Sequence, residues 1–330
     1  MTERVSWQDK YAIVCHQNAS GAAYEGATFT AGSTGVDADA YALMLNNHPD
    51  LNTGFGVDTR TLANNGVSIN NFDLDLIAPK FTIEFDATLK MLGLFSWLLC
   101  QGGVSEGAGS TYTKTITQAT YASAGSSCEV WASFLRLMAE GSTAESLVAH
   151  GCVCSDLTIT GVVGGVVKCS ATMVARNVVN DFNAGSAILN FSNDDPLLFQ
   201  SCSFARDGSN PSDISSFTIK LTNNLTVEHK SNDSRLCSGY RLGMLTSTLD
   251  IVVPWSADAG GNSWQNSLEA GTAFGTICTL IMSASALIAF TNPRIVSAQT
   301  IDDGGVVSLA LSMVGTEITY LITDSVNRLP

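Results

Sequence analysis

Few residues in this chain have types and spacings that could support catalysis or metal binding. None of the histidines lies in a GxSxG or HExxH frame. The four are His16, His48, His150 and His229. One cluster has metal-like spacing, because His150, Cys152 and Cys154 alternate and would share one face of a regular strand. Tetrahedral zinc needs a fourth ligand, so the favoured interpretation is a set of small residues buried in a core.

Two other patterns lack the geometry for chemistry. Cys15 and His16 are adjacent, and adjacent residues on a strand face opposite sides, which rules out a nucleophile and base pair. Two Gly-Gly pairs lack the following Lys-Ser/Thr of a phosphate-binding loop, so they are interpreted as hairpin turns. These hairpin positions are Gly164, Gly165, Gly304 and Gly305.

Acidic pairs leave calcium binding open as an alternative. None has the loop spacing of a known calcium site, and acidic turns are common. The pairs are Asp37 and Asp39, Asp73 and Asp75, Asp194 and Asp195, and Asp302 and Asp303. Nothing in the sequence gives two carboxylates the different pKa values that glycoside hydrolysis needs. The sequence therefore predicts no catalytic residue, no metal site and no cofactor, and the protein is not expected to be an enzyme.

Composition narrows the class of protein further. The 330 residues are 45% hydrophobic and only 14% charged, which favours surfaces buried against copies of the same chain. The net charge of −14 argues against a protein that grips nucleic acid, although DNA could slide past an acidic wall. Nine cysteines, an odd number without an export signal, predict reduced and mostly buried thiols in the cytosol.

Alternating apolar and polar residues predict a mostly β chain with a small helical component. Helices are expected at residues 89–101 and 264–271, with 143–148 as a further candidate. Residues 271–290 carry no charge and are long enough to span a bilayer. Their Gly, Ser and Thr content favours two buried strands joined near residues 283–285 instead.

An internal repeat predicts a duplicated unit. Residues 164–175 read GGVVKCSATMVA and residues 304–315 read GGVVSLALSMVG, at an offset of 304 − 164 = 140. Each follows a strand-like run, which is typical of a hairpin closing each half of the chain. A strand with an acidic residue, Asp86 or Asp250, also precedes a helical segment in each half. We therefore expect two tandem β-sandwich or barrel domains, 1–180 and 181–330, each flanked by a short helix.

The order of these segments resembles the tail tube proteins of long-tailed, non-contractile bacteriophages. The resemblance covers roughly residues 75–320. In the first half it rests on PKFTIEFDATLKMLGLFSWLLCQGG, TYTKTIT, SCEVWASFL and AHGCVCSDLTITGVVGGVVKCSATMVARNV. In the second half it rests on DPLLFQSCSFARDGS, SSFTIKLTNNLTVEHK and YRLGMLTSTLDIVV.

The resemblance implies a tail-tube-like β-sandwich whose copies close rings around a β-barrel channel and stack into a conduit for DNA ejection. With two units in each chain, three chains would make a pseudo-hexameric ring. Long arms would reach the adjacent ring, and the candidates are residues 27–75 and 226–242. Asp86 and Asp250 are candidates for the lumen or an interface. The implied partners are further copies, a tape measure protein, terminator or tip proteins, and passing double-stranded DNA, in a virion tail assembled in the host cytoplasm.

Two other hypotheses remain at this point. A capsid decoration protein or an Ig-like adhesin would use the same strand-rich composition without polymerising. A hydrolase on a β scaffold would need chemistry that the sparse histidines do not supply.

Overall fold

The computed structural model describes the greater part of the chain. The described residues are 10–17, 40–51, 57–60, 71–74, 78–106, 112–118, 130–137, 146–180, 195–208, 213–228, 237, 239–254, 267–303, 306–315 and 317–324.

Strands dominate both halves of the chain. The first half contains β1 (Lys10–Gln17), β2 (Ala40–Leu43), β3 (Val57–Arg60), β4 (Asn71–Leu74), β5 (Lys80–Asp86), α1 (Leu89–Cys100), β6 (Gln101–Glu106), β7 (Tyr112–Gln118), β8 (Val130–Leu137), β9 (Ser146–Val162), β10 (Lys168–Val174) and β11 (Asn177–Asn180). The second half contains η2 (Phe199–Ser201), β12 (Ser203–Arg206), β13 (Ser216–Thr222), β14 (Thr226–Glu228), β15 (Gly239–Arg241), β16 (Thr246–Pro254), β17 (Ile277–Ser283), β18 (Ala286–Thr291), β19 (Arg294–Asp303), β20 (Val306–Val314) and β21 (Glu317–Asp324).

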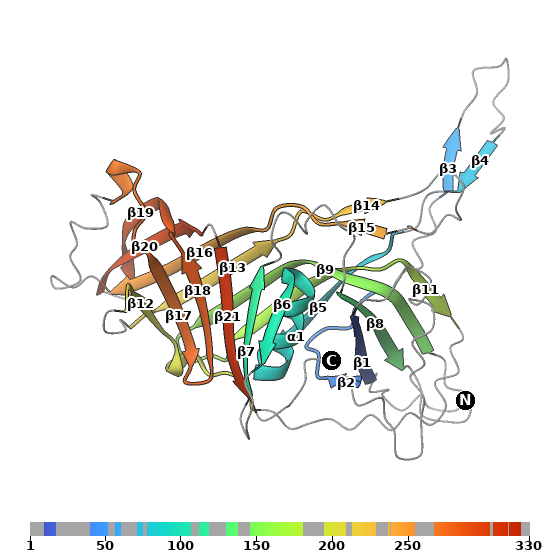
Figure 1. The fold of residues 1–330 in the computed structure, drawn as a ribbon, viewed down its shortest axis with the longest axis horizontal. Helices are drawn as coiled ribbons and strands as arrows, with labels where there is room; N and C mark the ends of the chain where they lie inside the picture. The colour runs from blue at the N-terminus through green and yellow to red at the C-terminus, as the bar shows by residue number, and fades with distance from the viewer. Residues whose placement is uncertain are drawn as a thin grey trace.

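Two large sheets and helix α1 enclose the core (Figure 1). The eleven-stranded sheet has the order β19-β20-β16-β13-β9-β8-β1-β2, with β10 between β9 and β5, and β11 beside β9. The six-stranded sheet has the order β12-β17-β18-β21-β7-β6. Alternation along the strands explains the layering: β16, for example, buries Leu249, Ile251 and Val253 and turns the residues between them outward.

Helix α1 is buried from Met91 to its last residue, as its apolar sequence predicts. It begins after Thr88, whose hydroxyl accepts a hydrogen bond from the amide of Met91. It ends at Gln101, which has a positive φ of 54°. The Gln101 side chain donates to the carbonyls of Leu98 and Val130, so the cap also fixes the start of β8.

The mostly β fold with minor helix is confirmed. The uncharged stretch 271–290 contains β17, the turn at 284–285 and most of β18, as predicted. The second predicted helix is present at 267–270, and residues 264–266 lie outside the described ones. The helix candidate at 143–148 is wrong from residue 146 onward, because β9 begins there. No helix among the described residues is long and apolar enough to cross a membrane.

Two three-stranded units in the larger sheet have the same order and register. β10 lies between β9 and β5, and β20 lies between β19 and β16. In the first hairpin Ser155 is skipped beside the pair made by Met173, and in the second Val296 is skipped beside the pair made by Met313. The two methionines are 313 − 173 = 140 residues apart, which is the offset of the sequence repeat. A bulge at equivalent places is a local detail that unrelated hairpins would not share.

The third strands of the two units match at another constant offset. Lys80 pairs with Val174 and Thr248 pairs with Val314. Because Val174 and Val314 are equivalent, β5 and β16 are related by 248 − 80 = 168 residues.

Strands from the two halves also pair with each other. β13 pairs with β9, and β21 pairs with β7, so both large sheets cross residue 180. One cluster of buried hydrophobic residues runs through both halves. The two units therefore share a core, and the division into domains 1–180 and 181–330 stays a prediction.

Candidate functional site

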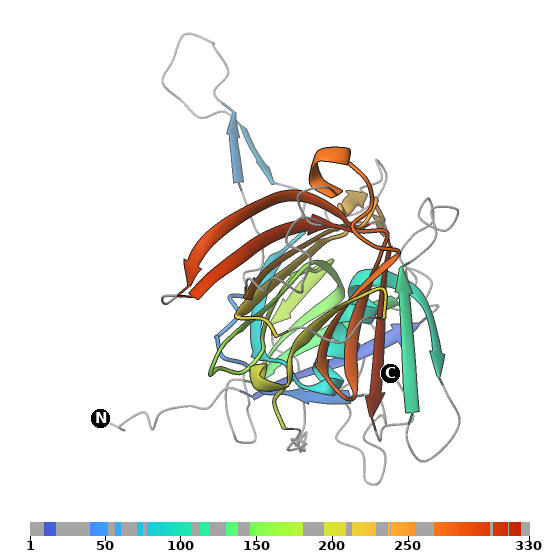
Figure 2. The ribbon, with the colours of Figure 1, turned by 90° about the vertical axis from the view of Figure 1, so that its left-hand side faces the viewer.

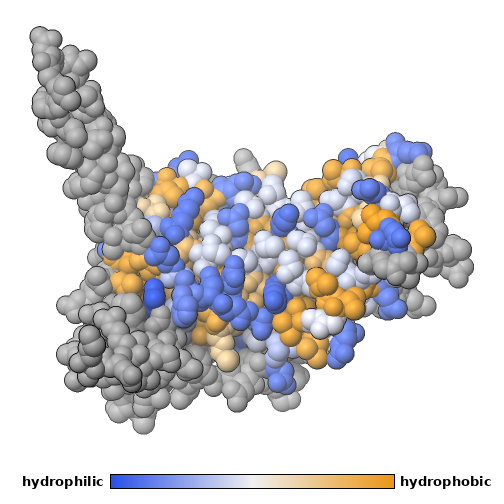
Figure 3. Space-filling model, turned by 180° about the vertical axis from the view of Figure 1, so that it is seen from behind, coloured by the Kyte–Doolittle hydropathy of each residue, from blue (hydrophilic) through white to orange (hydrophobic). Residues whose placement is uncertain are grey.

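The larger sheet has a polar face on the side away from the core. On β5, β10, β9, β13 and β16 this face alternates with the buried one and consists mainly of threonine, serine and a few charged residues. In the view opposite to that of Figure 1, mainly hydrophilic and intermediate residues, drawn in blue and white, occupy the middle of the described surface (Figure 3). The charged members number four acids and three lysines: Glu84, Asp86, Asp156, Asp250, Lys80, Lys168 and Lys220. The face is therefore close to neutral, although the whole chain has a net charge of −14.

Asp86 and Asp250 lie in one cross-strand row of this face. From Asp250 the row continues through Thr218, Thr160 and Lys168 to Asp86. The two carboxylates are 250 − 86 = 164 residues apart, which differs from the offset of 168 between β5 and β16, so they are not equivalent positions. Lys168 lies directly opposite Asp86 on the neighbouring strand, and opposite charges in such a cross-strand pair are stabilising.

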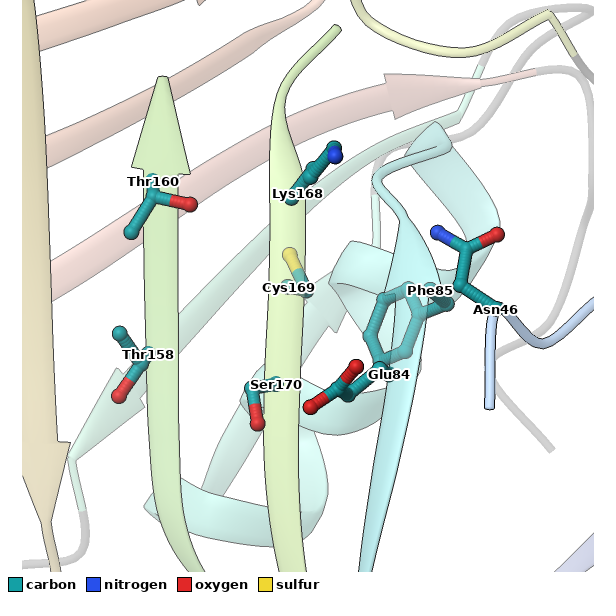
Figure 4. Close-up of a pocket in the computed structure, with 8 residues that line it drawn as sticks. All are labelled: Asn46, Glu84, Phe85, Thr158, Thr160, Lys168, Cys169 and Ser170. Atoms are coloured by element: carbon teal, nitrogen blue, oxygen red, sulfur yellow. The ribbon is translucent and has the colours of Figure 1, made fainter. Parts of the chain in front are cut away.

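A shallow pocket opens on the same face beside this row (Figure 4). Its volume is about 240 Å³, below the roughly 300–1,000 Å³ of small-molecule sites. Its lining residues are Asn46, Glu84, Phe85, Thr158, Thr160, Lys168, Cys169 and Ser170. In the second unit, strand β13 pairs with β16. In the first unit, Asn46 lies beside β5, and its backbone amide donates a hydrogen bond to the Glu84 carbonyl at 2.7 Å. The pocket is therefore a surface feature between paired strands, too small for a substrate cavity.

The predicted hairpin glycines fall between paired strands. Gly164 and Gly165 lie in the turn from β9 to β10, and Gly164 has a φ of +79°, which a side chain would strain. Gly304 and Gly305 lie outside the described residues, between β19 and β20.

The metal-like cluster does not come together. The β8–β9 register shifts between the partners Ala149 and Cys152, and Gly151 there has a φ of 61°. This irregularity breaks the alternation, so His150 faces Ser133, whose hydroxyl is 3.4 Å from its Nδ1. Cys152 packs in the main core instead.

The other chemical candidates are separated or lie outside the described part of the chain. Tyr11 contacts His48 through its hydroxyl, 2.8 Å from Nδ1. No group of three potential metal ligands is found among the described residues. Asp37, Asp39, Asp75, Asp194 and His229 lie outside them.

The seven cysteines whose surroundings are described are all free and buried. Burial raises the pKa of the Cys100 and Cys278 thiols to about 12 each and that of Cys202 to about 11. A thiol must lose its proton to act as a nucleophile, so these side chains are inert packing groups at neutral pH.

A ribbon formed by β14 and β15 packs over the first unit. Tyr240 of β15 is fully buried against Trp131, with ring centroids 5.1 Å apart, and its hydroxyl donates to the Val174 carbonyl at 3.3 Å. With Val153 and Cys237 these residues form a small separate cluster. This ribbon lies within the candidate arm at 226–242, whose reach to an adjacent ring stays a prediction; the sequence did not predict the Tyr240 contact, because nothing local marks Tyr240 as an anchor.

Asn223, between β13 and β14, anchors the segment that leads into the same ribbon. Its side-chain amide donates to the carbonyls of Leu99 in α1 and Cys154 in β9, both at 3.2 Å, and its backbone amide donates to the Ser155 carbonyl. The bulge at Ser155 therefore meets the end of a strand from the other half of the chain. Asn223 begins the Asn-Asn-Leu of SSFTIKLTNNLTVEHK, one of the segments on which the family resemblance rests.

The described residues thus combine a polar sheet face, strand pairing between the two units and two short ribbons. The model of one protein family, described as phage tail tube protein, matches residues 13–315. A search of curated proteins finds no match.

Proposed function

Because this chain belongs to the phage tail tube protein family and is a structural component of the virion tail, we propose that its copies join into rings that stack into a hollow conduit for DNA. The non-enzymatic role follows from the same family.

The observation that supports ring formation is the joint between the two units. At one end of the larger sheet the three strands of the second unit, β19-β20-β16, are followed by β13, which pairs with β9 of the first unit over seven residues. The first unit continues with β10 and β5, beside which Asn46 and Asn47 bond to Glu84 and Thr82. The next element in this series would be β19 of a second copy, whose outer edge has no strand partner among the described residues.

Such a contact joins different surfaces of neighbouring copies, and it closes when the rotation per unit divides a full circle. With domains 1–180 and 181–330 as two units in each chain, three chains would give a ring of six units. Closing the ring would cover both open edges, which otherwise favour uncontrolled aggregation.

The polar face would line the channel. Hydroxyl groups and balanced charges, with Asp86 and Asp250 in one row, offer no continuous array of cations for phosphate groups. Double-stranded DNA would then pass without being held. A tape measure protein inside the tube and terminator or tip proteins at its ends are the further partners, and buried free thiols are consistent with assembly in the host cytoplasm.

Electron microscopy of the purified chain under assembly conditions tests the proposal. Rings or tubes of constant inner width are expected. The double variant Gln299→Lys/Thr300→Lys places charges on the exposed edge strand β19 and should abolish them. The matched control, Gln200→Lys/Ser201→Lys, changes two exposed residues outside the sheets and should leave assembly intact. Wild-type chains that remain monomeric, or tubes that tolerate the edge variant, would contradict the proposal.

A further inference from the structure

The chain contains two ribbons with the same backbone pairing. β3 pairs with β4, and β14 pairs with β15, both as short antiparallel ladders. Three of the four register pairs of the first ribbon have a counterpart 168 positions later, the offset that also relates β5 to β16. The matching register pairs are Asp58–Asp73 with Thr226–Arg241, Thr59–Phe72 with Val227–Tyr240, and Arg60–Asn71 with Glu228–Gly239.

Residue types support this equivalence. Phe72 occupies the register position of Tyr240, so both ribbons have an aromatic residue there. Arg241 and Glu228 form an ion pair at 2.6 Å, and the residues 168 positions earlier are Asp73 and Arg60, which are also one acid and one arginine. The two ribbons are therefore versions of one element.

Among the described residues, contacts with a unit of this chain are found for the β14–β15 ribbon. Figures 1 and 2 show β3 and β4 standing away from the sheets, whereas Figure 1 shows β14 and β15 close to β9. Tyr240 of the docked ribbon covers Val174, which is 1% exposed.

The second unit presents the equivalent surface uncovered. Val314 lies 140 residues after Val174, at the same register position, and is 39% exposed. Arg294, its partner on β19, stands where Val153 stands in the first unit and is also exposed. Met244, just before β16, is 65% exposed nearby in the sequence.

We propose that the β3–β4 ribbon of one copy docks on the Val314 surface of the second unit in a neighbouring copy, with Phe72 in the role of Tyr240. The proposal rests on the proposed function, because ring closure places the first unit of one chain beside the second unit of the next. The docked ribbon inside each chain is its template. Two differences shape the contact: phenylalanine has no hydroxyl for the Val314 carbonyl, and Arg294 offers a methylene stem and a guanidinium in place of valine.

Cross-linking of the full chain tests this contact. The double variant Phe72→Cys/Val314→Cys, assembled and treated with a short bismaleimide, should yield covalent multimers on a denaturing gel. The control Phe72→Cys/Val307→Cys moves the second thiol to the opposite end of β20, where Val307 is 54% exposed, and should give at least fivefold less product. Each single variant supplies the background from the native thiols.

A second pair of variants measures the contribution of the aromatic ring. Phe72→Ala should raise the protein concentration needed for assembly about tenfold or more, as expected for a buried aromatic anchor. Phe72→Tyr should leave it within about twofold, since tyrosine fills the template position. Unchanged melting of the monomer would show that the alanine variant is folded.

The outcomes separate the two proposals. Tubes that form without the Phe72–Val314 product, or that give as much product with Val307, overturn the ribbon contact and leave the tube function standing. If the wild-type chain forms neither rings nor tubes, both proposals are rejected.

Discussion

Gly161→Ala should destabilise the joint between the two units, because no room exists for a side chain there. Gly161 of β9 lies directly opposite Phe217 of β13. A Cβ atom at Gly161 would lie 2.3 Å from Cε1 of Phe217 and 2.8 Å from Cδ2 of Phe199, whose ring stacks on Phe217 with centroids 6.0 Å apart. Carbon atoms in contact are about 3.5–4.0 Å apart, so both rings would have to move.

The magnitude follows from two opposing effects. Overpacking a core costs about 1–3 kcal/mol, while alanine recovers about 0.4–1 kcal/mol by restricting the unfolded chain. We expect a net loss of about 1–2 kcal/mol in the free energy of unfolding. Urea unfolding of the unassembled subunit measures it, and Gly239→Ala, where a Cβ meets nothing within 4 Å, should stay within about 0.5 kcal/mol of wild type.

A double-mutant cycle identifies the cause. Phe217→Leu removes the atoms that approach Gly161 most closely, so Gly161→Ala should cost at least about 1 kcal/mol less in that background. If Gly161→Ala leaves the stability unchanged, or costs the same with leucine at 217, the steric argument is wrong.

Three further predictions follow from buried polar groups and thiols. Asn223→Ala removes the donor to two carbonyls and should lower the free energy of unfolding by about 1–3 kcal/mol, measured by urea unfolding; an unchanged value would refute it. Tyr240→Phe loses one hydrogen bond and should cost about 0.5–1.5 kcal/mol, whereas Tyr240→Ala should cost about 3–5 kcal/mol; equal losses in thermal melts would contradict the packing role of the ring. The pKa of Cys100 is raised from 9.0 to about 12, so its stabilisation is complete below pH 9 and falls by about 1.4 kcal/mol per pH unit above it. Unfolding from pH 8 to 11 with Cys100→Ala as reference checks this slope, and identical slopes for both chains would refute it.

The sequence predicted those helices and strands that form from short runs of neighbouring residues. The helix at 89–100 and the strands around residue 284 follow from runs of apolar residues with turn formers between them. The Gly-Gly-Val-Val repeat correctly gave the offset of 140 between the hairpins. It could not give the second offset of 168, because the ribbons share pairing and hardly any sequence identity.

The sequence did not predict the contacts between residues that are far apart in the chain. The alternation of His150, Cys152 and Cys154 suggested a shared face, but Gly151 adopts a positive φ and interrupts it. Tyr240 reaches Trp131 across more than a hundred residues, so no periodicity could pair them. Such contacts depend on how the units are arranged, and an arrangement leaves no local signal.

Because both units belong to one polypeptide, the joint within the chain and the proposed joint between copies form in different ways. The β13–β9 joint forms within the chain, where tethering gives the two strands a high effective concentration. The proposed joint between β19 and the first unit of another copy would depend on protein concentration. β19 is a ten-residue edge strand, the kind that pairs indiscriminately when left open. It ends in Asp302 and Asp303, and charges on an edge discourage irregular pairing. A ribbon that docks on the neighbouring Val314 surface would then select the correct partner, because an unrelated strand could satisfy the edge but would not bring an aromatic residue to that surface.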